Sequence, residues 1–398
     1  TAAETGSNIR LYTQDNWGED LIFNVYDGAP YYWDKTLGLG ARATTFASQT
    51  GASDAPTITR RIMVSGADRH VVCFGCNPIN ETDQDLLMVR WSDQEDPVDW
   101  TPTATNTAGS QRISSGSEII SAQKTRQEML IWTDTSLHAM RFTGPPFTFG
   151  MSMLANNVSI LGPNAVTTVG DKVFWMDREN FYVYTGRVQV IPCTLLRYVF
   201  DDINLDQSFK CFAASNKMFD EVFWFYPTSD SDEIDRYVKF NFTENTWDLG
   251  SLSRTAWVDY GIHDNPRGSG AVSSVNYIYI HELGQNNDGS AMTAFIESAD
   301  FDLGDGDHFM FMSRVVPDIS ITDTSGDSSG TVDYIVKTRN YPGDSLTTNS
   351  TNSVTPTTQQ SFVRARSRQA VMRIQSASTD LAWTLGDLRL DLRPDGRR

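Results

Sequence analysis

The amino-acid sequence predicts an all-β protein: a β-propeller of about six blades, followed by a small C-terminal β-sandwich-like domain. Short aromatic or β-branched runs recur about every fifty residues, which is close to the spacing of four-stranded propeller blades. Turn-forming Gly, Asp, Asn and Pro bound these runs, and the recurrence stops near residue 300. Because one blade cannot bury its own faces, the recurrence predicts sheets stacked around an axis. The six runs are Leu21–Phe23, Val71–Phe74, Leu130–Trp132, Val173–Trp175, Val222–Trp224 and Tyr277–Tyr279.

The predicted elements follow one another along the chain. Residues 9–34 read as strand, turn and strand, with the turn at Asp27-Gly28-Ala29-Pro30. Residues 36–57 are rich in Gly, Ala, Thr and Ser and predict a long connection. Between the fourth and fifth units, apolar residues spaced by three and four over residues 194–207 predict a short helix capped by Thr194. The later units span about residues 58–100, 111–151, 158–192, 211–250 and 253–299.

The composition changes at Asp300–Asp307, and this segment predicts a domain boundary between residues 1–299 and 300–398. Beyond it, the apolar pattern predicts a compact β-sandwich-like domain. Residues 345–360 are mostly Ser, Thr, Asn and Gln, and they predict a loop at one end. The predicted strands are Met310–Val316, Val332–Thr338, Phe362–Arg368, Ala370–Gln375 and Leu388–Leu392.

Charge and composition narrow the function classes. The 398 residues include 32 Lys or Arg and 50 Asp or Glu, a formal net charge of −18. General nucleic-acid binding needs a basic surface, so this balance argues against it. The negative net charge is still compatible with a channel whose acidic wall lets a polyanion pass without binding it. No apolar run is long enough to cross a bilayer, and no basic-then-apolar leader is present, although the chain begins at Thr1 rather than Met.

The sequence predicts no enzymatic activity, no cofactor and no metal site. Cys73 and Cys76 have the spacing of a metal or redox pair, but no second ligand pair follows, so buried thiols are expected. The acidic residues of Asp300–Asp307 resemble a calcium loop without its completing glutamate. Gly326–Gly330 fits the nucleophile-elbow pattern by letter, but it lacks the strand-to-helix setting. The acidic groups at Asp93–Asp96 and Asp230–Asp235 are expected at solvated hairpin tips.

An arginine row is the one candidate contact site. Arg364, Arg366 and Arg368 alternate along a predicted strand, so their side chains share one face. Residues 362–398 hold eight arginines and four aspartates, a charge of +4, which leaves −22 for the rest of the chain. Two interpretations stay open: a solvated edge that prevents aggregation, or a contact with the acidic propeller of a neighbouring copy.

Several strings, in order along the chain, resemble a known family. They are Arg90–Trp100 (RWSDQEDPVDW), Ile131–Asp134 with Arg141–Phe147, Phe181–Gly186 and Leu390–Arg398. Together they resemble the tail nozzle, tail-tube or stabilisation proteins of short-tailed bacteriophages, over about residues 17–398. The resemblance implies a propeller-like body, six copies around the tail axis, attachment to an adaptor beneath the portal, and a lumen for DNA ejection.

The sequence therefore predicts a structural virion protein of a phage tail. We expect a homohexameric ring that contacts the tail adaptor and fibre or other tail proteins and passes genomic DNA without sequence-specific binding. The main alternative is a receptor- or glycan-binding tail propeller that acts in host adsorption. A third hypothesis is a glycan-cleaving tail enzyme, which would need two catalytic carboxylates that flank the glycosidic bond.

Overall fold

A computed structural model describes residues 10–66, 68–272, 275–323 and 330–397. The chain divides into two compact units, Thr1–His281 and Glu282–Arg398. The predicted boundary at 299/300 lies too late in the chain. Strand β24 (Ala294–Glu297) pairs with β31 (Gln369–Ser376), and this pairing assigns it to the second unit.

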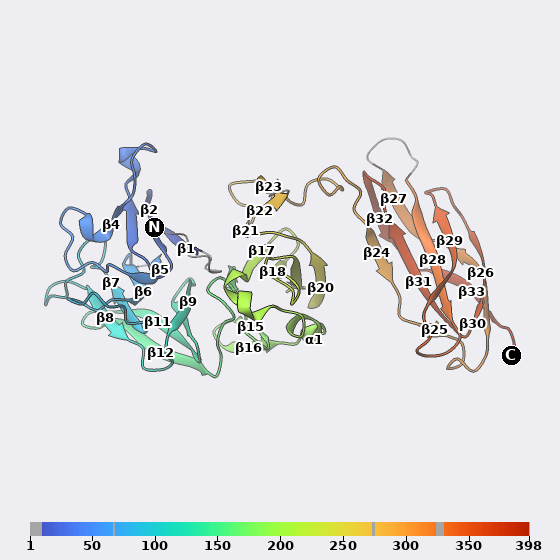
Figure 1. The fold of residues 1–398 in the computed structure, drawn as a ribbon, viewed down its shortest axis with the longest axis horizontal. Helices are drawn as coiled ribbons and strands as arrows, with labels where there is room; N and C mark the ends of the chain where they lie inside the picture. Colours follow the sequence, from blue (N-terminus) through green and yellow to red (C-terminus); the bar gives the residue numbers. More distant parts are fainter. Residues whose placement is uncertain (1–9, 67, 273–274, 324–329, 398) are drawn as a thin grey trace. The chain divides into compact units, whose positions relative to one another are not determined.

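The first unit consists of six consecutive antiparallel sheets, as a propeller requires (Figure 1). Five sheets have four strands and the sixth has three. Sheet 1 holds β1 (Tyr12–Trp17), β2 (Asp20–Val25), β3 (Pro30–Trp33) and β4 (Thr44–Thr45). Sheet 2 holds β5 (Thr59–Val64), β6 (Val71–Cys76), β7 (Met88–Trp91) and β8 (Gly109–Arg112). Sheet 3 holds β9 (Ile119–Lys124), β10 (Met129–Thr133), β11 (Ser136–Gly144) and β12 (Thr148–Asn156).

The later sheets continue the same up-and-down order. Sheet 4 holds β13 (Val166–Val169), β14 (Lys172–Met176), β15 (Phe181–Tyr184) and β16 (Val188–Ile191). Sheet 5 holds β17 (Phe212–Asn216), β18 (Glu221–Tyr226), β19 (Arg236–Asn241) and β20 (Thr246–Ser251). Sheet 6 holds β21 (Ala256–Val258), β22 (Arg267–Val272) and β23 (Val275–Ile280).

The recurrent runs of the sequence occupy one structural position. In sheets 1 to 5 each run lies in the second strand, namely β2, β6, β10, β14 and β18. The sixth run lies in β23, the third strand of its sheet. A second strand has a paired neighbour on both sides, and in sheets 3, 4 and 5 it carries a buried tryptophan. Trp132, Trp175 and Trp224 are each at most 1% exposed.

Neighbouring sheets bury one another, which is the packing expected of propeller blades. The first strands contact in sequence: β1 with β5, β5 with β9, β9 with β13, β13 with β17, and β17 with β21. The largest apolar cluster joins sheets 3, 4 and 5, where the rings of Trp132 and Trp175 lie 5.4 Å apart. Smaller clusters join sheets 1 and 2, sheets 2 and 3, and sheets 5 and 6. The all-β propeller fold predicted from the sequence is therefore confirmed.

The connection between sheets 4 and 5 differs from its predicted form. It contains α1 (Leu196–Phe200) and the 3₁₀ helix η3 (Leu205–Lys210) instead of one helix over 194–207. Leu195, rather than Thr194, occupies the N-cap position and makes no side-chain cap bond. The predicted short helix is thus present as α1, and Val199 and Ile203, four residues apart, are buried in the core between the sheets. The predicted connection at 36–57 also holds η1 (Lys35–Leu37), η2 (Phe46–Ser48) and the fourth strand of sheet 1.

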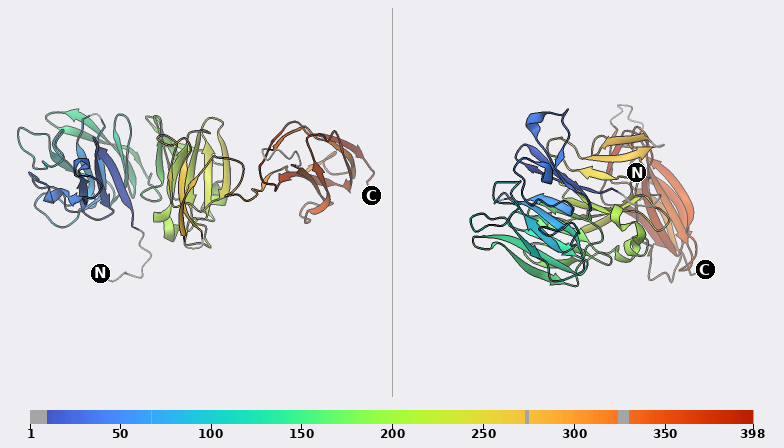
Figure 2. Two further views of the ribbon diagram at one scale, coloured as in Figure 1. Left: turned by 90° about the horizontal axis from the view of Figure 1, so that it is seen from above. Right: turned by 60° about the vertical axis from the view of Figure 1, so that its left-hand side comes forward.

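The second unit contains layered antiparallel strands (Figure 2). One sheet has the strand order β24-β31-β28-β29, and β25 also pairs with β31. A second sheet has the strand order β30-β26-β33. Strands β27 and β32 form a separate pair. Met310, Tyr334, Val363 and Ile374 are among the buried residues of its core. Its further strands are β25 (Phe301–Asp302), β26 (Met310–Val316), β27 (Ile319–Asp323), β28 (Val332–Arg339), β29 (Thr347–Val354), β30 (Ser361–Ser367), β32 (Leu381–Leu385) and β33 (Arg389–Pro394).

The predicted loop at 345–360 is wrong in its first half. Residues Thr347–Val354 form β29, which pairs along its length with β28. Of its side chains only Val354 is buried, so the strand has no apolar alternation that the sequence could reveal. Backbone pairing and the β-propensity of threonine hold this edge strand in place.

Candidate functional site

The predicted arginine row lies on and just beyond β30 in the C-terminal unit. Arg364 and Arg366 are exposed on the outer face of this strand, and buried Val363 and Ala365 alternate with them. Arg368 lies beyond the end of the strand and is partly buried. The alternation placed the side chains correctly for Arg364 and Arg366.

Two of the three arginines have partners inside their own unit. Arg366 donates from Nε to Asp395 Oδ2 at 2.6 Å. Arg368 donates to the carbonyl oxygens of Gly306 at 2.8 Å, and of Asp307 and Arg397 at 3.0 Å. Both guanidinium groups also stack on Phe309, with 4.1 and 4.9 Å to the ring centre. These contacts tie the C-terminal segment to β30.

Arg364 differs from the other two arginines. Within the part of the chain that the structure describes, no hydrogen bond or ion pair is found for its guanidinium. Its neighbour on the same face, Phe362, is 69% exposed. An unpaired cation next to an exposed ring is the part of the row that remains available to an outside partner.

The other residues that the sequence analysis considered for metal binding or catalysis do not form a reactive site in the described part of the chain. Cys73 and Cys76 are both buried in β6, and burial raises the pKa of Cys76 to about 12, so both thiols stay protonated. Asp300 pairs with Arg339 at 2.5 Å. Among the described residues, no group of three or more His, Cys, Asp or Glu side chains could hold a metal ion. Residues 324–329, which hold most of the elbow-like string Gly326–Gly330, lie outside the described residues.

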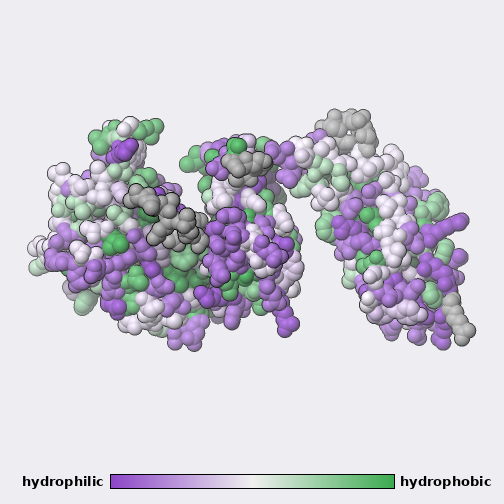
Figure 3. All heavy atoms as spheres, viewed as in Figure 1, coloured by the Kyte–Doolittle hydropathy of each residue, from purple (hydrophilic) through white to green (hydrophobic). Residues whose placement is uncertain are grey.

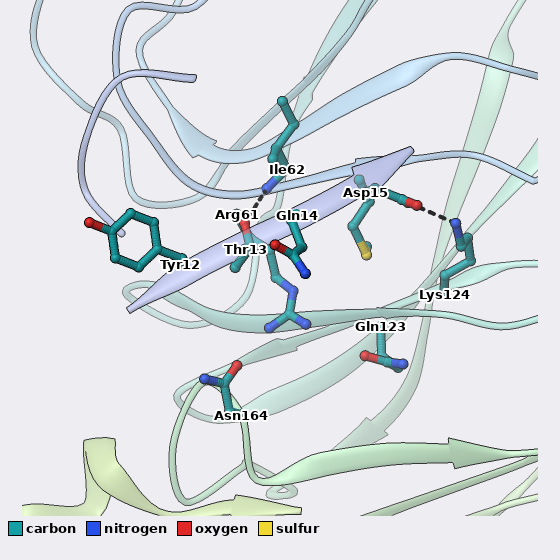
Figure 4. Close-up of a pocket in the computed structure, with 10 residues that line it drawn as sticks. Tyr12, Thr13, Gln14, Asp15, Arg61, Ile62, Gln123, Lys124 and Asn164 are labelled. Atoms are coloured by element: carbon teal, nitrogen blue, oxygen red, sulfur yellow. Dashed lines mark hydrogen bonds and ion pairs between the residues drawn. The ribbon is translucent and has the colours of Figure 1, made fainter. Parts of the chain in front are cut away.

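A pocket that the sequence did not reveal lies along the first strands of sheets 1, 2 and 3 (Figure 4). Its volume is about 340 Å³. It is lined by Tyr12, Thr13, Gln14 and Asp15 of β1, Arg61, Ile62 and Met63 of β5, Gln123 and Lys124 of β9, and Asn164 ahead of β13.

Two neighbouring arginines of β5 have opposite environments. Arg60 pairs with Asp27 at 3.1 Å and with Glu118 at 2.7 Å. Burial lowers the pKa of Arg60, but Tyr26, Glu118 and Asp27 more than compensate and raise it. Arg61 points the other way, into the pocket, and has no carboxylate partner among the described residues. Burial lowers the pKa of Arg61 to about 10, so it is still charged at neutral pH.

The remaining charges of the pocket cancel. Lys124 Nζ lies 2.7 Å from Asp15 Oδ2, which also accepts a hydrogen bond from the Val64 amide at 2.9 Å. Arg61 is therefore the uncompensated charge among the residues that line the pocket. The sequence could not reveal this site, because its polar residues come from segments far apart in the chain, from Tyr12 in β1 to Asn164 ahead of β13.

No protein-family model matches the sequence, and no curated protein matches it. Among solved structures, the extracellular domain of a hybrid two-component system from B. thetaiotaomicron is similar with a TM-score of 0.41 and 9% identity. That match covers 71% of this chain and 34% of the other, so this chain spans about a third of its length. Dihydro-heme d1 dehydrogenase NirN in complex with DHE has a TM-score of 0.39 and 10% identity, covering 88% of this chain and 67% of that one. A Synechocystis apocarotenoid oxygenase mutant has a TM-score of 0.35 and 8% identity, covering 68% and 66%.

None of the helices in the described part of the chain has the length and apolar character needed to span a membrane.

Proposed function

We propose that this protein is a structural component of a bacteriophage tail, the nozzle or tail-tube protein, whose copies form a ring around the DNA ejection channel. The observation that carries the proposal is the order of the family-like strings along the chain, from Arg90–Trp100 to Leu390–Arg398. The propeller body agrees with the fold that this resemblance implies. The protein then acts as a wall and has no catalytic activity.

The net charge of −18 supports this role. An acidic wall repels the DNA backbone, so the polyanion passes without being retained. Propeller sheets packed through buried tryptophans supply the rigidity that a channel wall needs. In this proposal the homohexamer also binds a tail adaptor and fibre or other tail proteins in the virion.

The C-terminal unit supplies the contact between copies in this proposal. Arg366 and Arg368 bind within their own unit. Arg364 and Phe362 are then the residues of β30 that reach the acidic propeller of a neighbouring copy. Contacts between opposite charges weaken with salt, so ring assembly should be salt-dependent.

Native mass spectrometry of the full chain tests this proposal. We expect a hexamer at low ionic strength, partial dissociation at high ionic strength, and loss of the hexamer in Arg364→Glu. Arg126→Glu is the matched control, because Arg126 is 81% exposed, makes only a 3.4 Å pair with Asp171, and lies in the propeller. A monomer under all conditions would contradict the ring, and equal assembly of both variants would contradict the role of Arg364.

Exposed aromatic loop residues favour one second candidate, a receptor- or glycan-binding tail propeller. Phe147 between β11 and β12 is 79% exposed, and Tyr341 between β28 and β29 is 64% exposed. Exposed rings of this kind can stack on sugar faces. Binding of the isolated protein to host surface glycans, lost in Phe147→Ala or Tyr341→Ala, would favour adsorption over a channel role.

A further inference from the structure

The pocket beside β5 contains an arginine whose environment is incomplete. Arg61 Nη1 donates to Ser121 Oγ at 3.1 Å and to the Pro163 carbonyl at 2.9 Å. Arg61 Nε is buried and has no hydrogen-bond partner, and no described residue accepts a bond from Nη2. One side of the guanidinium is fixed and the other is unsatisfied.

Arg61 is partly buried, and a cation without a counter-charge in such a place is costly, because the protein does not fully replace the solvation that the cation loses. Among the residues that the structure describes, carboxylates pair with Arg60, one residue away, but none pairs with Arg61. The protein has 50 acidic residues, so a low number of carboxylates does not explain why Arg61 lacks one among the described residues. A partner that balances Arg61 therefore has to come from outside the described residues.

Two side-chain amides surround the unsatisfied guanidinium. Gln14 and Asn164 line the pocket with Arg61, and Figure 4 shows them on either side of it. Neither amide group makes a side-chain hydrogen bond within the described part of the chain. Gln123 is not counted among these donors, because its Nε2 already donates to Thr168 Oγ1 at 3.0 Å. Amide N–H groups and a guanidinium are donors suited to oxyanions.

We propose that this pocket binds a small oxyanion, a phosphate or carboxylate group, through Arg61 with support from Gln14 and Asn164. The planar guanidinium offers two parallel N–H donors, and this geometry matches a pair of ligand oxygens. A volume of about 340 Å³ is at the lower end for small-molecule sites, so the ligand is a small molecule and not a polymer. This inference is independent of the proposed function.

The experiment titrates the full-length chain with sodium phosphate and, separately, with sodium malonate, against sodium chloride of equal ionic strength. Calorimetry and melting temperature are the readouts. We expect one site and a rise of about 3–5 °C at a concentration one hundred times the dissociation constant. The two titrations decide whether phosphate or carboxylate is the preferred group.

The variants Arg61→Met and Arg61→Lys locate the site. Arg61→Met should abolish binding yet melt in chloride at or above the wild-type temperature, because it removes an uncompensated, partly buried charge. Arg61→Lys keeps the charge but not the two parallel donors, and it should bind at least about tenfold more weakly. Arg126→Met is the matched control for loss of a positive charge and should bind as the wild type does.

Three results would overturn the proposal. The first is that neither anion binds the wild type at millimolar concentration. The second is that both anions bind Arg61→Met as tightly as the wild type. Should Arg61→Met fail to fold, equal binding by Arg61→Lys, Asn164→Ala and the wild type would count against the site in the same way.

Discussion

Sheets 5 and 6 are built from similar apolar runs, yet they have opposite surroundings. In β18 of sheet 5, five of six residues are buried, and Trp224 is 1% exposed. In β23 of sheet 6, five of six residues are exposed, and Ile278 is 74% exposed. Figure 3 shows hydrophobic residues reaching the surface in the N-terminal unit. The comparison teaches that burial is a property of the neighbouring sheets and not of the run itself.

The difference follows from position in the sheet. Strand β18 pairs with β17 on one side and β19 on the other, and sheets 4 and 6 pack against sheet 5. Strand β23 is the edge of a three-stranded sheet and, among the described strands, pairs only with β22. Its outer backbone groups and its β-branched and aromatic side chains therefore face solvent in the isolated chain.

The largest expected effect on stability comes from a substitution in the buried strand β18. Trp224→Ala removes a ring that lies 4.8 Å from Phe181 and 6.0 Å from Trp247. We expect the free energy of unfolding to fall by about 3–5 kcal/mol, because a cavity forms between sheets 4 and 5. Denaturant titration followed by tryptophan fluorescence measures this loss. A loss below about 1 kcal/mol would contradict the packing described here.

An intermediate effect is expected from pH in sheet 6. His281 lies 4.5 Å from Trp257 and within hydrogen-bond distance of Arg254. Burial, with a further contribution from Arg254, lowers the pKa of His281 to about 4. In the unfolded chain its pKa is near 6.5, so the unfolded state takes up the proton first as the pH falls. Stability should therefore decline from about pH 6.5 to pH 4.

The variant His281→Gln isolates this contribution from the many carboxylates that also titrate in acid. The melting temperature of the wild type should fall more steeply than that of His281→Gln between pH 7 and pH 4. Parallel curves for the two proteins would show that His281 is protonated equally readily in both states.

The smallest effect is expected at the exposed edge. Ile278→Ser should change the free energy of unfolding by no more than about 0.5 kcal/mol, because the side chain is already largely in solvent. The same change should reduce self-association, since it shortens an exposed apolar edge strand. Denaturant titration and light scattering measure the two effects. Destabilisation close to that of Trp224→Ala would mean that β23 is covered.

Much of the fold was predictable because it depends on local patterns. The recurrent runs located all six sheets, and alternation located β26, β28, β30, β31 and β33 in the C-terminal unit. Strand β29 was not predicted, because seven of its eight side chains are at least partly exposed and its sequence has no apolar alternation. The strand exists because β28 offers it a backbone partner.

For the candidate sites, too, local patterns predicted part of the arrangement and tertiary contacts decided the rest. Strand alternation alone placed Arg364 and Arg366 on one face. Alternation could not show that Asp395 and the carbonyls of Gly306 and Asp307 would satisfy Arg366 and Arg368. Nor could it distinguish Arg60, which has two carboxylate partners, from Arg61, which has none in the described part of the chain.

The sequence by itself determined that the chain would form successive short antiparallel strands, because alternation and turn residues act over a few positions. Only the tertiary structure decided which of these strands are covered and which charges are balanced. Both depend on residues that lie far apart in the chain and meet only when sheets pack. For this reason Trp224 is buried, Ile278 is exposed, and Arg61 faces a pocket whose Asp15 carboxylate is already paired with Lys124.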